Sequence, residues 1–167
     1  KINMSIELVR IDDRLIHGQI ATTWINDYNI EQVLIVDDNV VQDKMQQSVI
    51  SMTAPANVKV KVFGVDSFIG IYKKNPIKRR TMIVLTNSID AYRLLAGGVQ
   101  IDYLNVGGMR FLDGRTKIAR AVSVTPEERE AFKKIIEMGI DVRIQMIPRD
   151  EIVEMKNVID NTDGGGK

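Results

Sequence analysis

The sequence contains no cysteine and only one histidine, His17. Without cysteine the chain can form no disulfide, no thiolate metal site and no cysteine nucleophile. A single histidine also excludes chemistry that needs a pair of them. No apolar run approaches the ~20 residues that cross a bilayer, and the stretch from Lys1 to Glu7 lacks the apolar core of a signal peptide. We therefore expect a cytoplasmic location.

An excess of one charge is also missing. Lys and Arg total 23 and Asp and Glu total 22, which leaves a net charge of +1. A protein that coats nucleic acid normally has a strongly basic surface, so we expect no nucleic-acid partner. Hydrophobic residues make up 44% and charged residues 27% of the chain, which are ordinary values for a globular protein. The length of 167 residues predicts one domain over 1–160, followed by a frayed tail at 161–167.

Short β-rich apolar runs recur along the chain and predict strands. Two of them, Val33–Val36 and Met82–Leu85, are unbroken, as expected of parallel strands covered on both faces. In Val58–Phe63 the valines alternate with Lys59 and Lys61, which predicts a strand near a sheet edge. The remaining predicted strands are Ile6–Ile11, Tyr103–Val106, Val142–Met146 and a short antiparallel extra strand at Thr116–Ala121.

Helical signals lie between these runs. Apolar residues four positions apart within Ile20–Tyr28 predict a helix with one buried face. At Thr125–Glu128 a capping box and a proline at the first helical position predict a helix that ends at Gly139. Asp90–Ala96 is followed by Gly97-Gly98, a good helix stop, and also predicts a helix. A weaker pattern predicts a last helix at Asp150–Ile159. The large apolar residues expected in the core outside the strands are Trp24, Met45, Met52 and Met138.

Alternating strands and helices predict an α/β fold, a doubly wound, mainly parallel sheet with helices on both faces. In such sheets the binding crevice lies outside the carboxyl ends of the strands. Neither a dinucleotide-binding G-x-G-x-x-G nor a Walker phosphate loop occurs there, so we expect no nucleotide cofactor. Asp37 and Asp38 lack further ligands nearby and predict a turn and helix cap, with no metal site. The loops that this rule selects are Asp12–Gln19, Asp37–Asn39, Thr86–Ser88 and Gly107–Arg110.

The only histidine falls in the first of these loops. His17 directly precedes a predicted helix whose first residues are Gly18 and Gln19. A helix N-terminus offers free amides and the positive end of the dipole to an anion, and Gly18 lets the backbone approach it closely. Arg14 can bring a guanidinium fork to the same anion. This combination suits a phosphohistidine, because phosphoryl transfer requires mainly positioning and charge stabilisation.

Two questions stay open at this point. The carboxylate that holds the other ring nitrogen of His17, or orients Arg14, can be Asp12 or Asp13. The alternative interpretation gives His17 a structural hydrogen bond in a non-catalytic doubly wound module that regulates or binds a small ligand. Residue spacing alone favours the structural interpretation, and the place of His17 at the carboxyl end of a strand makes the two equal.

The string Arg10–Gln19, which reads RIDDRLIHGQ, resembles the phosphorylation-site signature of one class of proteins. These are the IIB subunits of the mannose/fructose/sorbose class of the bacterial sugar phosphotransferase system. The similarity runs in order from about Ile6 to about Ile159. Further matching segments are Thr53–Pro55, Thr86–Asn87, Gly97–Val99, Asn105–Arg110 and Ala121–Val124.

This resemblance implies that His17 accepts a phosphoryl group on Nδ1 from the phosphohistidine of a IIA protein. His17 would then pass the group to a sugar bound by the membrane subunits IIC and IID, beside which the chain would work. Mannose or fructose is the first expectation for the sugar, and sorbose or N-acetylgalactosamine the alternative. No metal or other cofactor is implied. The residues expected to support His17 are Arg14, Asp12 and Asp13. Apart from the resemblance, the helix N-terminus predicts phosphate-facing backbone at Gly18 and Gln19, and the crevice rule predicts it at Gly107 and Gly108.

The sequence also contains two basic clusters. The first follows the Gly107-Gly108 pair and can steer an acidic partner such as phosphorylated IIA, since charge complementarity mainly raises association rates. Its members are Arg110, Arg115, Lys117 and Arg120. The second is expected to be a solvated helix end and comprises Lys73, Lys74, Lys78, Arg79 and Arg80. Whether the chain forms a homodimer is left open.

Overall fold

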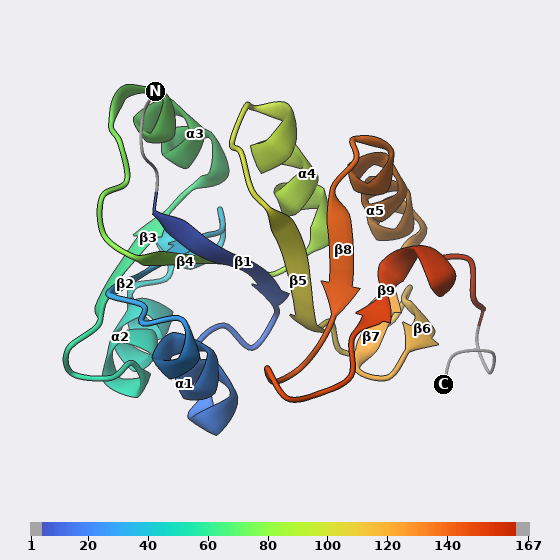
Figure 1. The fold of residues 1–167 in the computed structure, drawn as a ribbon, viewed down its shortest axis with the longest axis horizontal. Coiled ribbons are helices and arrows are strands. Elements are labelled where there is room, and N and C mark those ends of the chain that lie inside the picture. The colour runs from blue at the N-terminus through green and yellow to red at the C-terminus, as the bar shows by residue number, and fades with distance from the viewer. Residues whose placement is uncertain (1–4, 163–167) are drawn as a thin grey trace.

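A computed structural model describes residues 5–162 of the chain. Seven strands form one sheet in the order β3-β2-β4-β1-β5-β8-β9, and all neighbours are parallel except β8 and β9. Figure 1 shows β1 at the middle of this sheet, between β4 and β5. The bounds are β1 Ile6–Asp12, β2 Gln32–Val36, β3 Lys59–Phe63, β4 Thr81–Leu85, β5 Tyr103–Gly108, β8 Asp141–Ile144 and β9 Val153–Glu154.

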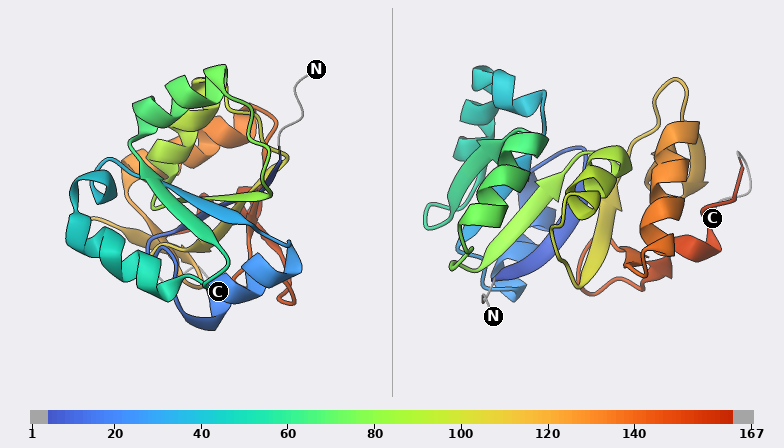
Figure 2. Two further views of the ribbon diagram at one scale, coloured as in Figure 1. Left: turned by 90° about the vertical axis from the view of Figure 1, so that its left-hand side faces the viewer. Right: turned by 90° about the horizontal axis from the view of Figure 1, so that it is seen from above.

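Helices cover both faces of the sheet, which confirms the predicted doubly wound α/β fold. Figure 2 shows α1 and α2 on one side of the strands and α3, α4 and α5 on the other. Their bounds are α1 Gly18–Asp27, α2 Lys44–Thr53, α3 Val65–Lys74, α4 Ser88–Ala96 and α5 Pro126–Glu137. Two short 3₁₀ helices cover Val40–Gln42 and Met155–Asn157.

Each face of the sheet has its own hydrophobic core. Trp24 and Ile25 of α1 pack with Leu8, Ile35 and Val84 on one face. The core on the other face includes Phe68 of α3, Leu94 of α4 and Phe132 of α5. Burial of one such side chain stabilises the fold by about 1.5–3 kcal/mol, so these two layers hold β1 rigidly in place.

The predicted strands are confirmed, because each predicted segment contains or overlaps a strand of the structure. β3 is an edge strand, as the lysine-valine alternation predicts. The extra strand is β6, Thr116–Ala119, which pairs antiparallel with β7, Val122–Val124, in a separate two-stranded sheet. The amide of Ser123 donates to the carbonyl of Met109, so this hairpin is fastened just beyond the end of β5.

The helix predicted at Asp150–Ile159 is wrong. Val153 and Glu154 instead form β9, where they pair with Ile144 and Arg143 of β8. The chain turns after Pro148, and the pairing with the edge of β8 satisfies backbone groups that a helix would otherwise satisfy internally. The sequence predicts a frayed tail at 161–167, and residues 163–167 lie outside the described residues. Asn161 belongs to the folded part, because its side-chain amide donates a hydrogen bond to the carbonyl of Ile118.

The prediction that three methionines lie in the core is also wrong. Met45 and Met52 are 80% and 85% exposed, and Met138 is half exposed. α2 buries only Ile50, so methionines on its other faces meet solvent. Met138 follows the buried face of α5 as its C-cap residue. Trp24, in contrast, is buried as predicted.

The second basic cluster is largely solvated, as expected. Lys73, Lys74, Lys78 and Arg79 are exposed. Arg80 differs, because it donates to the carbonyl of Tyr28 and forms an ion pair with Glu7. Among the described residues, no helix is long and apolar enough to cross a membrane.

Candidate functional site

The His17 loop leaves β1 at the carboxyl edge of the sheet. Asp12 is the last residue of β1, and α1 begins at Gly18 with His17 as its N-cap residue. Gly18 has a φ of +40°, a left-handed conformation that disfavours any larger residue. The loop therefore turns sharply from strand to helix and places His17 at the helix N-terminus, as the sequence predicts.

Asp12 is the hub of this site. It has no exposed surface, and its Oδ2 accepts hydrogen bonds from Nη2 of Arg10 at 3.1 Å and from Nε2 of His17 at 3.0 Å. Its Oδ1 accepts from the backbone N and the Nε of Arg14, both at 3.1 Å. Burial alone would raise the pKa of Asp12, but the bonds from His17 and Arg14 and the charge of Arg10 outweigh it and lower the pKa. Asp12 is therefore a carboxylate at neutral pH.

This contact determines the geometry of His17. A carboxylate can only accept, so Nε2 of the imidazole carries the proton that points to Asp12. In the neutral ring Nδ1 then keeps its lone pair, and the side chain is 22% exposed. The structure thus joins Asp12, rather than Asp13, to the ring, and it leaves Nδ1 as the nitrogen that can act as a nucleophile.

Asp13 does not contact the ring and instead binds two residues that follow β5. Its Oδ2 accepts from the backbone N of Arg110 at 2.9 Å and from Nη1 of Arg115 at 3.4 Å. Arg115 also forms two hydrogen bonds to the carboxylate of Glu128, at 3.0 and 2.8 Å, and its side chain is only 8% exposed. Asp13 therefore fastens the loop after β5 to the end of β1.

The first basic cluster is divided by these contacts. The side chain of Arg115 is little exposed and binds Asp13 and Glu128, so the structure does not place it on an exposed docking surface. Arg110 has a side chain that is 65% exposed, and Lys117 and Arg120 are exposed as well. Phe111 and Leu112 lie beside Arg110 in the sequence and are also exposed.

Gly107 makes room for the side chain of Arg10, whereas Gly108 has space for a Cβ atom. A Cβ atom at Gly107 would lie 2.0 Å from Nη2 of Arg10, so only glycine fits against that guanidinium. A Cβ atom at Gly108 would lie 3.4 Å from Nη2 of Arg14, which is an ordinary contact distance. Phosphate contacts by these two glycines and by the first turn of α1 remain a prediction. The side chain of Gln19 lies outside the described residues.

Sequence reasoning missed Arg10. It is 3% exposed, and Nη1 donates to Oδ1 of Asn105 at 2.6 Å and to the carbonyl of Gln145 at 3.1 Å. Its Nη2 donates to the carbonyl of Met146, which also accepts from Nε1 of Trp24 at 2.7 Å. A signal was available, because a charged residue inside an apolar strand is seldom buried without a specific partner.

The remaining selected loops have structural partners. Asp37 accepts hydrogen bonds from the backbone N of Asn39 and Val40 and from the hydroxyl of Thr86 at 2.6 Å. These bonds confirm the predicted turn at Asp37–Asn39. Asn87 caps α4 by accepting from the backbone N of Asp90.

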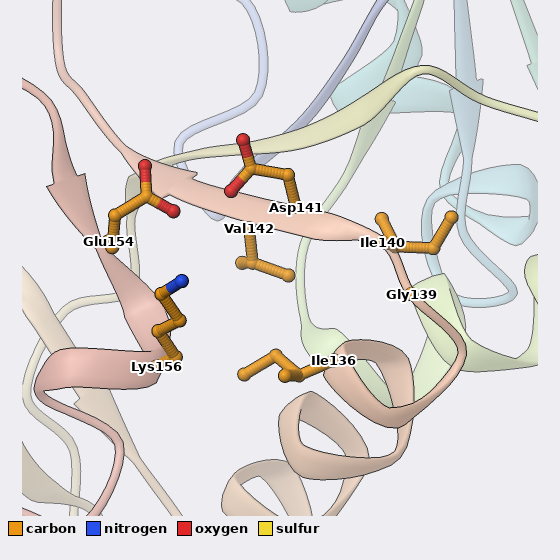
Figure 3. Close-up of a pocket in the computed structure, with 7 residues that line it drawn as sticks. All are labelled: Ile136, Gly139, Ile140, Asp141, Val142, Glu154 and Lys156. Atoms are coloured by element: carbon orange, nitrogen blue, oxygen red, sulfur yellow. The ribbon is translucent and has the colours of Figure 1, made fainter.

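A cavity of about 490 Å³ lies at the other end of β8, away from His17. Figure 3 shows that the carboxyl groups of Asp141 and Glu154 point toward one another there. A hydrogen bond between them lowers the pKa of Asp141 and raises that of Glu154. The cavity opens at the amino end of β8, whereas Asp12 and His17 follow the carboxyl end of β1, so it is not part of the His17 site. Its lining residues are Ile136, Gly139, Ile140, Asp141, Val142, Glu154 and Lys156.

Comparison with known proteins identifies the family. Residues 6–164 match the model of the phosphotransferase system sorbose subfamily IIB component. The fructose-specific EIIB component of Bacillus subtilis is 35% identical over 159 residues, which cover 95% of this chain and 98% of that protein. The crystal structure of the IIBSor domain of the sorbose permease from Klebsiella pneumoniae superposes with a TM-score of 0.87, at 30% identity, over 94% of this chain and 97% of that one.

A further relative is longer than this chain. The mannose-specific EIIAB component of Escherichia coli K12 is 40% identical over 162 residues, which are 96% of this chain but 50% of that protein. The chain thus spans about half the length of the mannose-specific relatives it matches. From the family match and the shared fold, the chain belongs to the sorbose subfamily of IIB components of the phosphotransferase system.

Proposed function

We propose that this chain is a phosphocarrier whose His17 accepts a phosphoryl group on Nδ1 and passes it to a sugar. The single observation that supports this most is the 3.0 Å contact between Nε2 of His17 and Asp12, which leaves the Nδ1 lone pair available. The donor would be the phosphohistidine of a IIA protein. The acceptor would be a sugar bound by membrane subunits IIC and IID, so the chain would work at the cytoplasmic side of the membrane.

The first step transfers the phosphoryl group from the donor imidazole to His17. Nδ1 attacks phosphorus as the bond from phosphorus to the donor imidazole nitrogen breaks, and the electron pair of that bond returns to the donor ring. The proton on Nε2 stays between His17 and Asp12, where the carboxylate offsets the positive charge that develops on the ring. In this proposal Arg14, whose side chain is 37% exposed, and the amides at the start of α1 bind the phosphoryl oxygens.

The second step reverses this chemistry. A sugar hydroxyl oxygen attacks the phosphorus, the bond from Nδ1 to phosphorus breaks, and its electron pair restores the Nδ1 lone pair. The proton released by the hydroxyl goes to solvent or to a base on the membrane subunits. Mannose or fructose is the proposed sugar, in keeping with the names of two relatives, and sorbose and N-acetylgalactosamine are the alternatives that other relatives bear.

Replacement of His17 tests the proposal directly. We expect His17→Ala to take up no phosphate from phosphorylated IIA, while the native chain forms an acid-labile phosphohistidine visible by phosphorus NMR. The variant should fold normally, because His17 makes no side-chain capping bond to α1 and its ring is partly exposed. Circular dichroism checks the fold.

Two results would argue against the proposal. Undiminished phosphate uptake by His17→Ala would place the phosphoryl group elsewhere. Absence of uptake by the native chain, with a competent donor, would favour the alternative in which His17 is structural and the module is not catalytic.

A further inference from the structure

Arg10 shares an acceptor atom with His17. Oδ2 of Asp12 accepts from Nη2 of Arg10 at 3.1 Å and from Nε2 of His17 at 3.0 Å. The guanidinium of Arg10 also lies 5.3 Å from the centre of the Trp24 ring and is almost entirely buried. A buried cation that shares one carboxylate oxygen with the imidazole affects the charge state of that ring, whether or not the cation touches a phosphoryl group.

We propose that Arg10 is a positioning residue for phosphoryl transfer that acts through Asp12 and keeps Nδ1 of His17 free of a proton. This inference rests on the proposed function. The imidazole can attack phosphorus only when Nδ1 has its lone pair. A buried carboxylate at Nε2 with too little positive charge around it would favour the doubly protonated ring, in which that lone pair is lost. The charge of Arg10 counteracts this effect.

The charges that face Asp12 come from three residues. Arg10 approaches from β1, Arg14 from the following loop and His17 from the start of α1. With a neutral His17, the two arginines and the carboxylate carry a net charge of +1, which favours an incoming phosphoryl dianion. Loss of Arg10 reduces this net charge to zero.

Other elements around this cluster contribute uncharged groups or charges with partners of their own. From β5 and the segment after β8 come the Asn105 amide and the carbonyls of Gln145 and Met146. The hydroxyl of Thr86, after β4, binds Asp37. The nearby carboxylate of Asp13 is held by Arg110 and Arg115.

A pH profile separates this function from simple support of the fold. The measurement is single-turnover phosphoryl uptake from phosphorylated IIA between pH 5 and 8 for the native chain, Arg10→Met and Arg10→Lys. For Arg10→Met we expect the acid limb of the profile to move up by about one pH unit, a tenfold loss of uptake on that limb. Arg10→Lys keeps the charge, so its acid limb should stay in place even if loss of the guanidinium fork slows uptake.

A second measurement does not depend on phosphoryl transfer. His17 is the only histidine, so its ring signals can be assigned without ambiguity in an NMR titration of the unphosphorylated protein. The ring of Arg10→Met should stay doubly protonated to higher pH than the ring of the native chain. If the titrations differ in this way while the native chain accepts no phosphate from a competent donor, the proposed function fails and the influence of Arg10 on His17 stands.

The matched control is Arg143→Met. Arg143 also lies over an aromatic ring, 4.0 Å from the centre of Tyr103, but its ion pair is with Asp141 at the amino end of β8. Neither the pH profile nor the titration should move in this variant.

Near-UV circular dichroism of Trp24, the only tryptophan, reports whether packing around residue 10 is kept. If Arg10→Met does not fold, Arg10→Gln, which is uncharged but still donates hydrogen bonds, takes its place. An unchanged acid limb and an unchanged titration in the neutral variant would overturn the proposal and leave Arg10 a purely structural residue.

Discussion

At the scale of single residues, Gly107 shows how little space separates the site from the backbone. Its hydrogen atom occupies the direction in which a side chain would meet the Arg10 guanidinium. Arg10 in turn holds Asp12, and Asp12 holds His17. The orientation of the imidazole therefore depends on a glycine that lies in another strand and makes no polar contact with the ring.

We expect Gly107→Ala to lower the free energy of unfolding by about 1–3 kcal/mol, the usual cost of forcing a methyl group into filled space. The new Cβ would lie 2.0 Å from Nη2 of Arg10, so the guanidinium must move. Gly108→Ala is the matched control, because its Cβ would lie 3.4 Å from Arg14. Urea denaturation of both variants measures the difference, and equal stability would show that Arg10 can be displaced at no cost.

At the scale of elements, the capping box at the start of α5 also helps to hold the loop after β5. Thr125 accepts from the backbone N of Glu128 at 3.0 Å, and Glu128 accepts from the backbone N of Thr125 at 2.9 Å. The same Glu128 carboxylate binds Arg115, which reaches Asp13 at the end of β1. A capping motif thus positions a carboxylate that also anchors the loop after β5.

We expect Thr125→Ala to destabilise the protein by about 1 kcal/mol, the typical effect of removing an N-cap side chain. Chemical denaturation followed by circular dichroism measures this change. Ser51→Ala serves as the control, because Ser51 is exposed within α2, and its effect should stay within about 0.5 kcal/mol. A Thr125→Ala variant as stable as the native chain would mean that the capping box does not limit stability.

At the scale of the whole molecule, three exposed cations follow the carboxyl end of β5, the strand next to β1. Arg110 lies in the loop that Asp13 holds, and Lys117 and Arg120 belong to the β6–β7 hairpin that follows this loop. Because the chain as a whole has a net charge of only +1, this local excess, rather than total charge, would guide an acidic partner.

Reversal of two of these charges tests the docking prediction. We expect Lys117→Glu combined with Arg120→Glu to lower the association rate with phosphorylated IIA about tenfold at low salt, because long-range steering is lost. The native rate should fall as salt rises, and the rate of transfer within the complex should change little. Stopped-flow measurements at several salt concentrations separate the two. Lys73→Glu with Lys74→Glu, in the last turn of α3, is the control, and an equal effect of both pairs would contradict local steering.

Local sequence patterns by themselves predicted most of the helices and strands, and they singled out His17 as the centre of the candidate site. Period-two and unbroken apolar runs depend on neighbours a few positions apart, and so do the capping box at Thr125 and the strand-to-helix turn before Gly18. The only histidine could be placed at the carboxyl edge of the sheet for the same reason. Where the local pattern was ambiguous, as in Asp150–Ile159, pairing with β8 overrode the helical spacing.

Only the tertiary structure decided which groups surround His17. Arg10 meets Asn105 and Met146, which lie 95 and 136 positions away, and Arg115 finds Glu128 and Asp13 rather than solvent. Such contacts depend on how strands distant in sequence align side by side, and no periodicity within one segment encodes that alignment. The choice between Asp12 and Asp13 had the same origin. Asp12 ends β1 and Asp13 begins the turn that follows, and only the positions of α1 and of the loop after β5 determine that Asp12 meets the imidazole while Asp13 meets Arg110 and Arg115.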